Sequence, residues 1–327
     1  MKLATAPDGS VLVKLIQGFV LLLLSAVCVV AQAQSSPTPP PVSTSTPQPP
    51  VAPPAEEVGA GEVVRVSANL VSVPVIVMNR QGQYVTDLQR NDFRVYENGK
   101  EQTIVHFSHV DQPFSVVLLI DTSGSTAPFI EQIKNAAKAF VEQLRPADTI
   151  RPVYFHGEIK ALTAAGISDP KLFAEAIDRI APGPWTMGTR LYDAVDFGLG
   201  ALRPNAARKA VILLTDGENT WGKATAKSTL RDAEESDVVV YTVQYGDLVP
   251  QTYLQQLAEK TGGRYFRGGD LNAIRQSFAT VAAELRRQYV LGYRLNEGAA
   301  AGVKTIKVKV DRKRVVVRAR RFYTYGQ

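Results

Sequence analysis

Between residues 113 and 288 the chain alternates continuous apolar runs with longer segments of helical spacing. Val116–Ile120, Ala210–Leu214 and Val238–Val243 are apolar at odd and even positions alike, as strands buried on both faces are. Strands that alternate with helices predict an α/β fold, here a doubly wound, mostly parallel, Rossmann-like sheet with helices on both faces. The helices are expected at Ile130–Leu144, Leu172–Ile180, Leu191–Leu202 and Leu254–Lys260.

The segment before this α/β unit has the period-two pattern of β-strands. The valines at odd positions from Val71 to Val77 share one face of a strand, and we interpret Pro74 as a sign that this strand lies at a sheet edge. Asn98-Gly99 lies between two further strands and predicts a tight hairpin. A segment of this size does not close a stable core alone.

The period-two pattern returns after the α/β unit, over Tyr289–Arg294, Val303–Val310 and Val315–Arg320. We infer that residues 62–111 and 289–327 form one β-sandwich into which the domain of residues 112–288 is inserted. The last predicted helix, Leu271–Arg287, runs almost directly into the strand at Tyr289. We therefore hypothesise that a movement of this helix would pull on the sandwich.

Residues 1–33 have the features of a secretory signal peptide. Lys2 and Lys14 precede the apolar run Leu15–Val30, and Ala31-Gln32-Ala33 has the small residues of a cleavage site. Residues 34–61 are rich in proline and predict a disordered, extended linker. We expect an exported protein, periplasmic or extracellular, with a membrane tether as the alternative if the N-terminal segment stays uncleaved.

The composition excludes several classes of partner and site. One cysteine and three histidines leave no disulfide scaffold and no Cys-ligated zinc site. The net charge is +6, and residues 304–321 alone carry nine Lys or Arg against one Asp. These cations alternate with inward valines, which is typical of the solvated face of a hairpin, so we expect no nucleic-acid partner. Contact with an anionic lipid or wall polymer stays open.

Oxygen-bearing side chains follow two of the predicted parallel strands. Asp121 ends the first strand and is followed by Ser123 and Ser125, and Asp216 ends a later strand. Thr189 lies at the start of a predicted helix between them. Because the carboxyl ends of parallel strands meet at one sheet edge, these five side chains are expected to converge. A set of oxygen donors without imidazole or thiolate suits Mg²⁺, with Mn²⁺ or Ca²⁺ as alternatives.

At these residues the chain resembles the von Willebrand factor type A (VWFA) family, over roughly residues 113–288, and its whole arrangement resembles exported VWFA-related proteins of acidobacteria. The metal-ion-dependent adhesion site (MIDAS) of that family has Asp-x-Ser-x-Ser, then Thr, then Asp, and all five positions are present here. The resemblance implies that Ser123, Ser125 and Thr189 bind the metal through hydroxyls, and Asp121 and Asp216 directly or through water. It also implies a protein partner whose Asp or Glu completes the coordination.

One segment departs from the family's pattern. Trp185-Thr186-Met187-Gly188-Thr189 stands where relatives often have Gly-Gly-Thr, so Thr186 competes with Thr189 for the third hydroxyl. The start of the following helix fits Thr189 better.

The two tryptophans flank the predicted site. Trp185 precedes Thr189 by four residues and Trp221 follows Asp216 by five, so both are expected on loops around the metal. We hypothesise an aromatic rim that binds the partner beside its carboxylate, because tryptophan is enriched at binding hot spots. The alternative is that each ring only packs its own loop.

No enzyme class fits the chain. Asp121-Thr122-Ser123 has serine where the aspartic proteases have glycine, and the only histidine of the α/β unit, His156, lies in no hydrolase motif. Glycine-rich phosphate loops are also missing. We therefore expect an exported, divalent-metal-dependent module for protein–protein interaction or adhesion. The alternative is a structural component of the cell envelope in which the metal only stabilises the fold.

Overall fold

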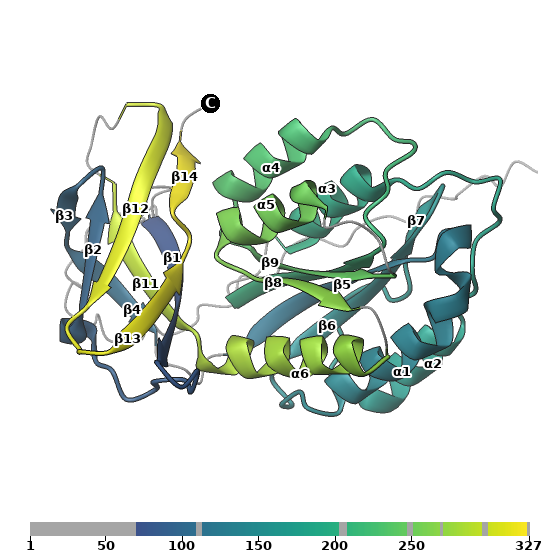
Figure 1. Cartoon of the computed structure of the whole chain (residues 1–327), viewed down its shortest axis with the longest axis horizontal. Coiled ribbons are helices and arrows are strands. Elements are labelled where there is room, and N and C mark those ends of the chain that lie inside the picture. The colour runs from purple at the N-terminus through teal and green to yellow at the C-terminus, as the bar shows by residue number, and fades with distance from the viewer. Residues whose placement is uncertain are drawn as a thin grey trace, which may run out of the picture. The chain divides into compact units, whose positions relative to one another are not determined.

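The computed structural model describes residues 70–108, 113–202, 208–246, 251–268, 271–295 and 300–325. The predicted signal peptide and the whole of the predicted linker lie outside these residues. The described residues belong to one compact unit, residues 64–327. Within it, a six-stranded sheet is flanked by helices, and two four-stranded sheets come from the N- and C-terminal segments (Figure 1). The predicted fold class is confirmed, including the insertion of the α/β part between the two β segments.

The six-stranded sheet has the order β10-β9-β8-β5-β6-β7, and only β7 is antiparallel to its neighbour. In its centre, Ile120 of β5 lies directly opposite Leu214 of β8. This register brings the residues that follow both strands to the same place at the carboxyl edge. The strands are β5 (Phe114–Asp121), β6 (Thr149–Phe155), β7 (Ile159–Ala161), β8 (Arg208–Thr215), β9 (Val239–Tyr245) and β10 (Tyr265–Gly268).

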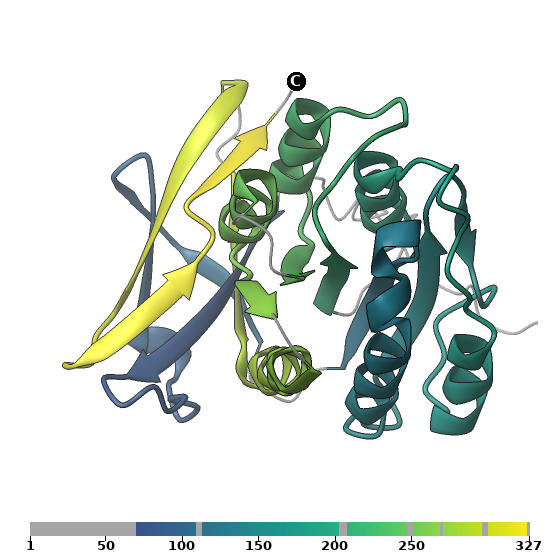
Figure 2. The same cartoon turned by 45° about the vertical axis from the view of Figure 1, so that its right-hand side comes forward.

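Helices cover both faces of this sheet, with α1, α2 and α6 on one side and α3, α4 and α5 on the other (Figures 1 and 2). Each side has its own apolar core, because alternate residues of the central strands point to opposite faces. The helices are α1 (Ile130–Val141), α2 (Pro170–Asp178), α3 (Leu191–Leu202), α4 (Ala226–Glu235), α5 (Thr252–Thr261) and α6 (Leu271–Arg287).

The β-sandwich packs the sheet β13-β1-β11-β4 against the sheet β14-β12-β2-β3, around a core of valines, Phe93, Tyr289 and Tyr293. At its hairpin, Asn98 and Gly99 have φ values of 47° and 82°, the left-handed pair that a two-residue turn requires. The strands are β1 (Leu70–Asn79), β2 (Phe93–Glu97), β3 (Lys100–Gln102), β4 (Ile104–Ser108), β11 (Tyr289–Arg294), β12 (Gly302–Val310), β13 (Val315–Ala319) and β14 (Phe322–Tyr325).

The placement of β1 at a sheet edge was wrong. This strand lies between β11 and β13. Its ladder with β13 begins only at Val75, which pairs with Ala319, so Pro74 has just one neighbouring strand at its own position. A residue without an N–H is tolerated there because the second ladder has not yet begun.

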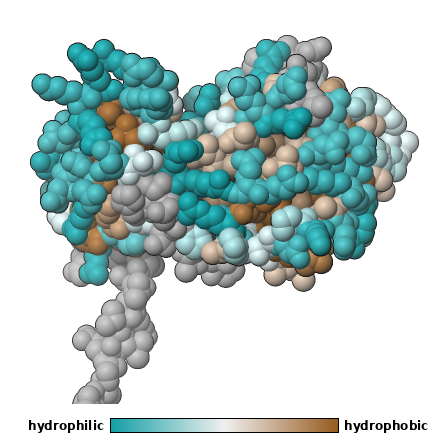
Figure 3. Space-filling model, turned by 90° about the horizontal axis from the view of Figure 1, so that it is seen from below, coloured by the Kyte–Doolittle hydropathy of each residue, from teal (hydrophilic) through white to brown (hydrophobic). Residues whose placement is uncertain are grey.

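Most of the face shown in Figure 3 is hydrophilic, with small hydrophobic areas between the polar side chains. Among the residues that the structure describes, no helix is long and apolar enough to cross a membrane.

Candidate metal centre

Asp121 is the most deeply buried of the predicted site residues, with none of its surface exposed. Its Oδ1 accepts a hydrogen bond from the Ser123 backbone N–H (2.9 Å), and its Oδ2 accepts one from the Thr215 hydroxyl (2.7 Å). Thr215 in turn accepts from the Gly217 N–H (2.9 Å). The end of β5 is thereby joined to the end of β8, and the carboxylate is held in one orientation.

Ser123, Ser125 and Asp216 are joined by a chain of hydrogen bonds. The two serine hydroxyls lie 3.0 Å apart, and the Ser125 hydroxyl donates to Oδ2 of Asp216. The other oxygen of Asp216 accepts from the Glu218 N–H (3.2 Å). Ser123 and Asp216 are almost fully buried, whereas Ser125 is exposed. Oxygen donors from two loops thus meet at a point that opens to solvent beside Ser125.

Thr189 is fixed to the loop that follows Asp216. Its backbone N–H donates to the Thr220 hydroxyl (2.7 Å), and its carbonyl accepts from the N–H groups of Thr220 (3.0 Å) and Trp221 (3.1 Å). Thr189 is 5% exposed, whereas Thr186 lies in an exposed turn. These backbone bonds favour Thr189 over Thr186 as the third hydroxyl.

The two carboxylates create an electrostatic strain that a cation would relieve. Burial, and then the negative charge of Asp216, raise the pKa of Asp121 to about 7, although the hydrogen bonds from Ser123 and Thr215 lower it in part. A divalent cation placed between the carboxylates would replace this repulsion by attraction.

The donor set fits a hard divalent cation. It consists of two carboxylates and three hydroxyls, without nitrogen or sulfur, which are the ligands that Mg²⁺ and Ca²⁺ prefer. In the described ranges no three His, Cys, Asp or Glu side chains gather at one place, so hydroxyl oxygens are needed to complete a site.

Both tryptophans lie on the loops around this site, and both rings are exposed, Trp185 by 77% and Trp221 by 62%. The Trp185 ring rests on Gly124, between the two serines: a Cβ at Gly124 would come within 2.5 Å of the ring. The backbone of Trp221 is bonded to Thr189, and the guanidinium of Arg190 lies 6.0 Å from its ring centroid. Both rings are exposed, but the Trp185 ring lies against the backbone of the site and the Trp221 backbone is hydrogen-bonded to it.

Three supporting residues were missed in the sequence. Thr215 and Thr220 bond the loops together, as described above. Asp193 of α3 accepts hydrogen bonds from the N–H groups of Lys223 (3.0 Å) and Ala224 (2.6 Å). Burial raises the pKa of Asp193, but these N–H groups and Arg190 outweigh it, so the pKa is lowered and the carboxylate stays charged. Of these three residues, only Thr215 could have been suspected from the sequence, because it stands between an apolar strand and the predicted ligand Asp216.

The fold and the site define a class: a doubly wound α/β domain with an acidic, hydroxyl-rich cluster at the carboxyl edge of its sheet. The von Willebrand factor type A domain matches residues 115–280, about half of the chain, and the chain belongs to this family.

The chain spans only a small part of the length of the curated relative that it matches. Over 170 residues the chain is 26% identical to human inter-alpha-trypsin inhibitor heavy chain H4; the match covers 46% of this chain but only 18% of that protein.

Two solved structures share the fold at a TM-score of 0.50. One is a von Willebrand factor type A protein from Catenulispora acidiphila, 13% identical, with 72% of this chain and 74% of that one covered. The other is proximal thread matrix protein 1 from the mussel byssus, with a zinc-occupied MIDAS motif, 18% identical, with 57% and 49% covered.

Proposed function

We propose that this protein is an exported interaction or adhesion module that binds an acidic residue of a protein partner through a divalent cation. The supporting observation is the chain of hydrogen bonds that joins Ser123, Ser125 and Asp216 next to the buried carboxylate of Asp121. In the mussel protein a divalent cation, zinc, occupies the MIDAS motif, which is a precedent within this fold. Mg²⁺ is our choice for this chain because every donor is a hard oxygen.

The five donors have different tasks in this proposal. Ser123, Ser125 and Thr189 offer neutral hydroxyls, whereas Asp121 and Asp216 supply the negative charge. Ser125 is the exposed member, so the partner's carboxylate approaches from its side. A bound cation supplies the open coordination position for that carboxylate. The signal-peptide features of residues 1–33 support export, and we therefore propose that this binding takes place outside the cytoplasm.

The test is capture of a partner from an extract of the source cell's envelope, with the chain lacking residues 1–33 as bait. We expect a partner retained in Mg²⁺ to be lost in EDTA and lost with Asp216→Asn, because both remove the cation that bridges the two proteins. Asp196→Asn is the matched control, since Asp196 is an exposed carboxylate on α3. A partner retained under all conditions would favour the structural alternative, in which a metal only stabilises the fold.

We further propose that Trp185 and Trp221 form an aromatic rim that binds the partner next to its acidic residue. Large apolar rings that are exposed to water often mark an interaction surface. The Trp185 ring lies against Gly124, and Trp221 is positioned by its backbone bond to Thr189 and by the Arg190 guanidinium. Rings that are already fixed lose little entropy on binding, which favours them as anchors.

Trp185→Ala and Trp221→Ala are each expected to weaken partner binding by about tenfold or more, the size of a hot spot, with Mg²⁺ affinity unchanged. Titration calorimetry with the captured partner, and separately with Mg²⁺, measures both. Val316→Ala is the control, because Val316 is a 52%-exposed apolar residue of β13. Losses below about twofold would mean that the rings only pack their own loops.

A further inference from the structure

The β-sandwich carries a large excess of positive charge. Its described residues, 70–108, 289–295 and 300–325, include fourteen Lys or Arg and five Asp or Glu, a net charge of +9. Residues 113–288 contain twenty of each and are neutral. Some of these cations have partners in the fold: Arg312 pairs with Asp87, Arg94 with Glu101 and Arg318 with Glu284. Five further cations lie on β12 and the turn that follows it: Lys304, Lys307, Lys309, Lys313 and Arg314.

One face of the sheet β14-β12-β2-β3 places like charges beside one another. Lys309 of β12 lies directly opposite Arg94 of β2, and Lys307 lies opposite Tyr96. Like charges at directly opposite positions destabilise a sheet. This repulsion is only partly compensated. A Glu101 carboxylate oxygen lies 3.1 Å from the Arg94 guanidinium, and the centre of the Tyr96 ring lies 4.9 Å from the Lys309 ammonium. Folding alone does not favour this arrangement, which suggests an anionic partner.

Apolar side chains are exposed on the same face. Val303 and Thr305 precede Lys307 at alternate positions of β12, and Phe322 of β14 pairs with Thr305. Val303 is 60% exposed and Phe322 is 39% exposed. Cations beside exposed apolar groups are typical of surfaces that bind anionic membranes, where the headgroups meet the charges and the interfacial region receives the apolar groups.

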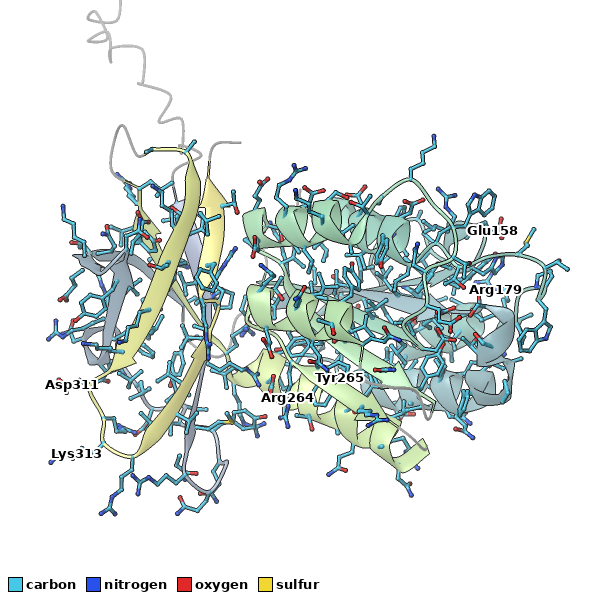
Figure 4. The ribbon with its side chains drawn as sticks, turned by 45° about the horizontal axis from the view of Figure 1, so that its top comes forward. Glu158, Arg179, Arg264, Tyr265, Asp311 and Lys313 are labelled. Carbon is cyan, nitrogen blue, oxygen red and sulfur yellow. The ribbon has the colours of Figure 1, made fainter. Side chains whose placement is uncertain are left out.

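A basic pocket lies beyond the Lys309 end of β12, between the turn that joins β12 to β13 and the loop that follows β1. Its volume is about 440 Å³, and it is lined by Arg80, Arg312, Lys313 and Arg314, with the amide side chains of Asn79 and Gln81. Two acids lie close by: Asp87, which pairs with Arg312, and Asp311, at the tip of the hairpin with Lys313 (Figure 4). Exposed guanidinium, ammonium and amide donors around one hollow are suited to a phosphate group.

We propose that the basic face, defined as Arg94, Val303, Lys307, Lys309 and Phe322, and the pocket beside it bind an anionic phospholipid bilayer. The pocket holds a headgroup phosphate and the sheet lies on the membrane surface. The position of the sandwich in the chain agrees with this partner, because β1 follows the predicted linker and the apolar export segment. A bilayer explains both the charges and the exposed apolar residues, whereas a soluble anionic polymer explains only the charges. This surface is separate from the metal centre.

The test is cosedimentation with vesicles, performed in EDTA so that the metal centre plays no part. The bait is the chain without residues 1–33, which keeps the whole compact unit of residues 64–327. We expect binding to vesicles of phosphatidylcholine with about a third phosphatidylglycerol, and none to phosphatidylcholine alone. The binding should weaken steeply as salt is raised.

Lys307→Glu/Lys309→Glu is expected to weaken vesicle binding at least tenfold. The sheet should tolerate the change, because one new carboxylate would lie opposite Arg94. Lys171→Glu/Lys227→Glu is the matched control: it makes the same change in net charge on exposed positions of α2 and α4. An equal loss in this control, equal binding to both kinds of vesicle, or binding to soluble polyphosphate without binding to vesicles would each overturn the proposal.

Discussion

Asp121→Asn is expected to abolish divalent-cation binding and, at the same time, to stabilise the cation-free protein at pH 8. Asp121 is completely buried, and its carboxylate shares the site with Asp216. Without a cation, burial and then the negative charge of Asp216 both disfavour the ionised form of Asp121. Asparagine keeps the shape of the side chain and removes one charge, so the cation loses a ligand while the fold loses a repulsion.

The sign of the pH effect follows from the raised pKa of Asp121, about 7 in the folded protein against 3.8 as its ordinary value. Between these values the folded state holds a proton that the unfolded chain has released, so the stability of the cation-free protein falls as pH rises from about 4 to about 7. The stability of Asp121→Asn should not fall over this pH range, because asparagine does not ionise. We expect it to exceed the wild type by about 4 kcal/mol at pH 8 in EDTA and to show little gain at pH 4.

Cation binding should depend on pH in the opposite sense. The cation must displace the proton from Asp121, so its affinity should fall by up to about tenfold per pH unit below pH 7. Urea unfolding in EDTA at pH 4, 6 and 8 measures the stability, and calorimetry with Mg²⁺ at pH 6 and 8 measures the affinity. A wild-type stability that is constant from pH 4 to 8, or a variant less stable than the wild type at pH 8, would show that burial and Asp216 do not destabilise the ionised Asp121.

The sequence was most informative where the signal is local. The acid that ends β5 and the two serines after it lie within five residues, and the strand-end position of Asp216 is visible in its own apolar run. Helices α3 and α6 begin and end as predicted, because their apolar spacing is regular. Helix α4 was missed because it buries few apolar residues and depends on a capping box between Thr225 and Ser228.

Contacts between distant residues had no such signal. The hydrogen bonds between Thr189 and Thr220 and between Thr215 and Asp121 join residues that lie 31 and 94 positions apart, and neither Thr215 nor Thr220 stands in a motif. Whether β1 lies at a sheet edge depends on its pairing with β13, and the sequence of β1 alone does not show that pairing. For the same reason, the sequence showed that α6 runs into β11 but not what holds that helix in place.

Glu284 of α6 is fully buried, and its carboxylate pairs with Arg318 of β13 and lies 3.6 Å from Arg264. Burial lowers the pKa of Arg318, but Glu284 outweighs it and the pKa is raised, so the guanidinium stays charged. Burial and the charge of Glu284 also raise the pKa of the Tyr241 hydroxyl well above its ordinary value. The helix that precedes β11 is thus bound to the sandwich by a charge pair removed from water, in addition to the continuous chain.

Glu284→Gln is therefore expected to lower the free energy of unfolding by about 3–5 kcal/mol, since it leaves Arg318 charged, largely buried and without its partner. Glu284→Met/Arg318→Met should recover most of that loss, because two apolar side chains need no compensation. Urea unfolding of both variants measures the effect. Glu235→Gln is the control: Glu235 lies 3.9 Å from Arg231 in a partly exposed pair, and its loss should change little.

A loss below about 1 kcal/mol for Glu284→Gln would mean that the pair contributes nothing net to stability, and α6 would then be free to shift against the sandwich at low cost. The expected large loss means the opposite: any movement of α6 that follows cation or partner binding must carry β13 with it or break a buried ion pair. Helix α6 also packs against the six-stranded sheet, whose strand β5 ends at Asp121, so cation binding could move it. Small-angle scattering of the wild type and of Glu284→Met/Arg318→Met, each with and without Mg²⁺, separates these outcomes. A scattering change confined to the double-Met variant would show that the pair restrains the helix.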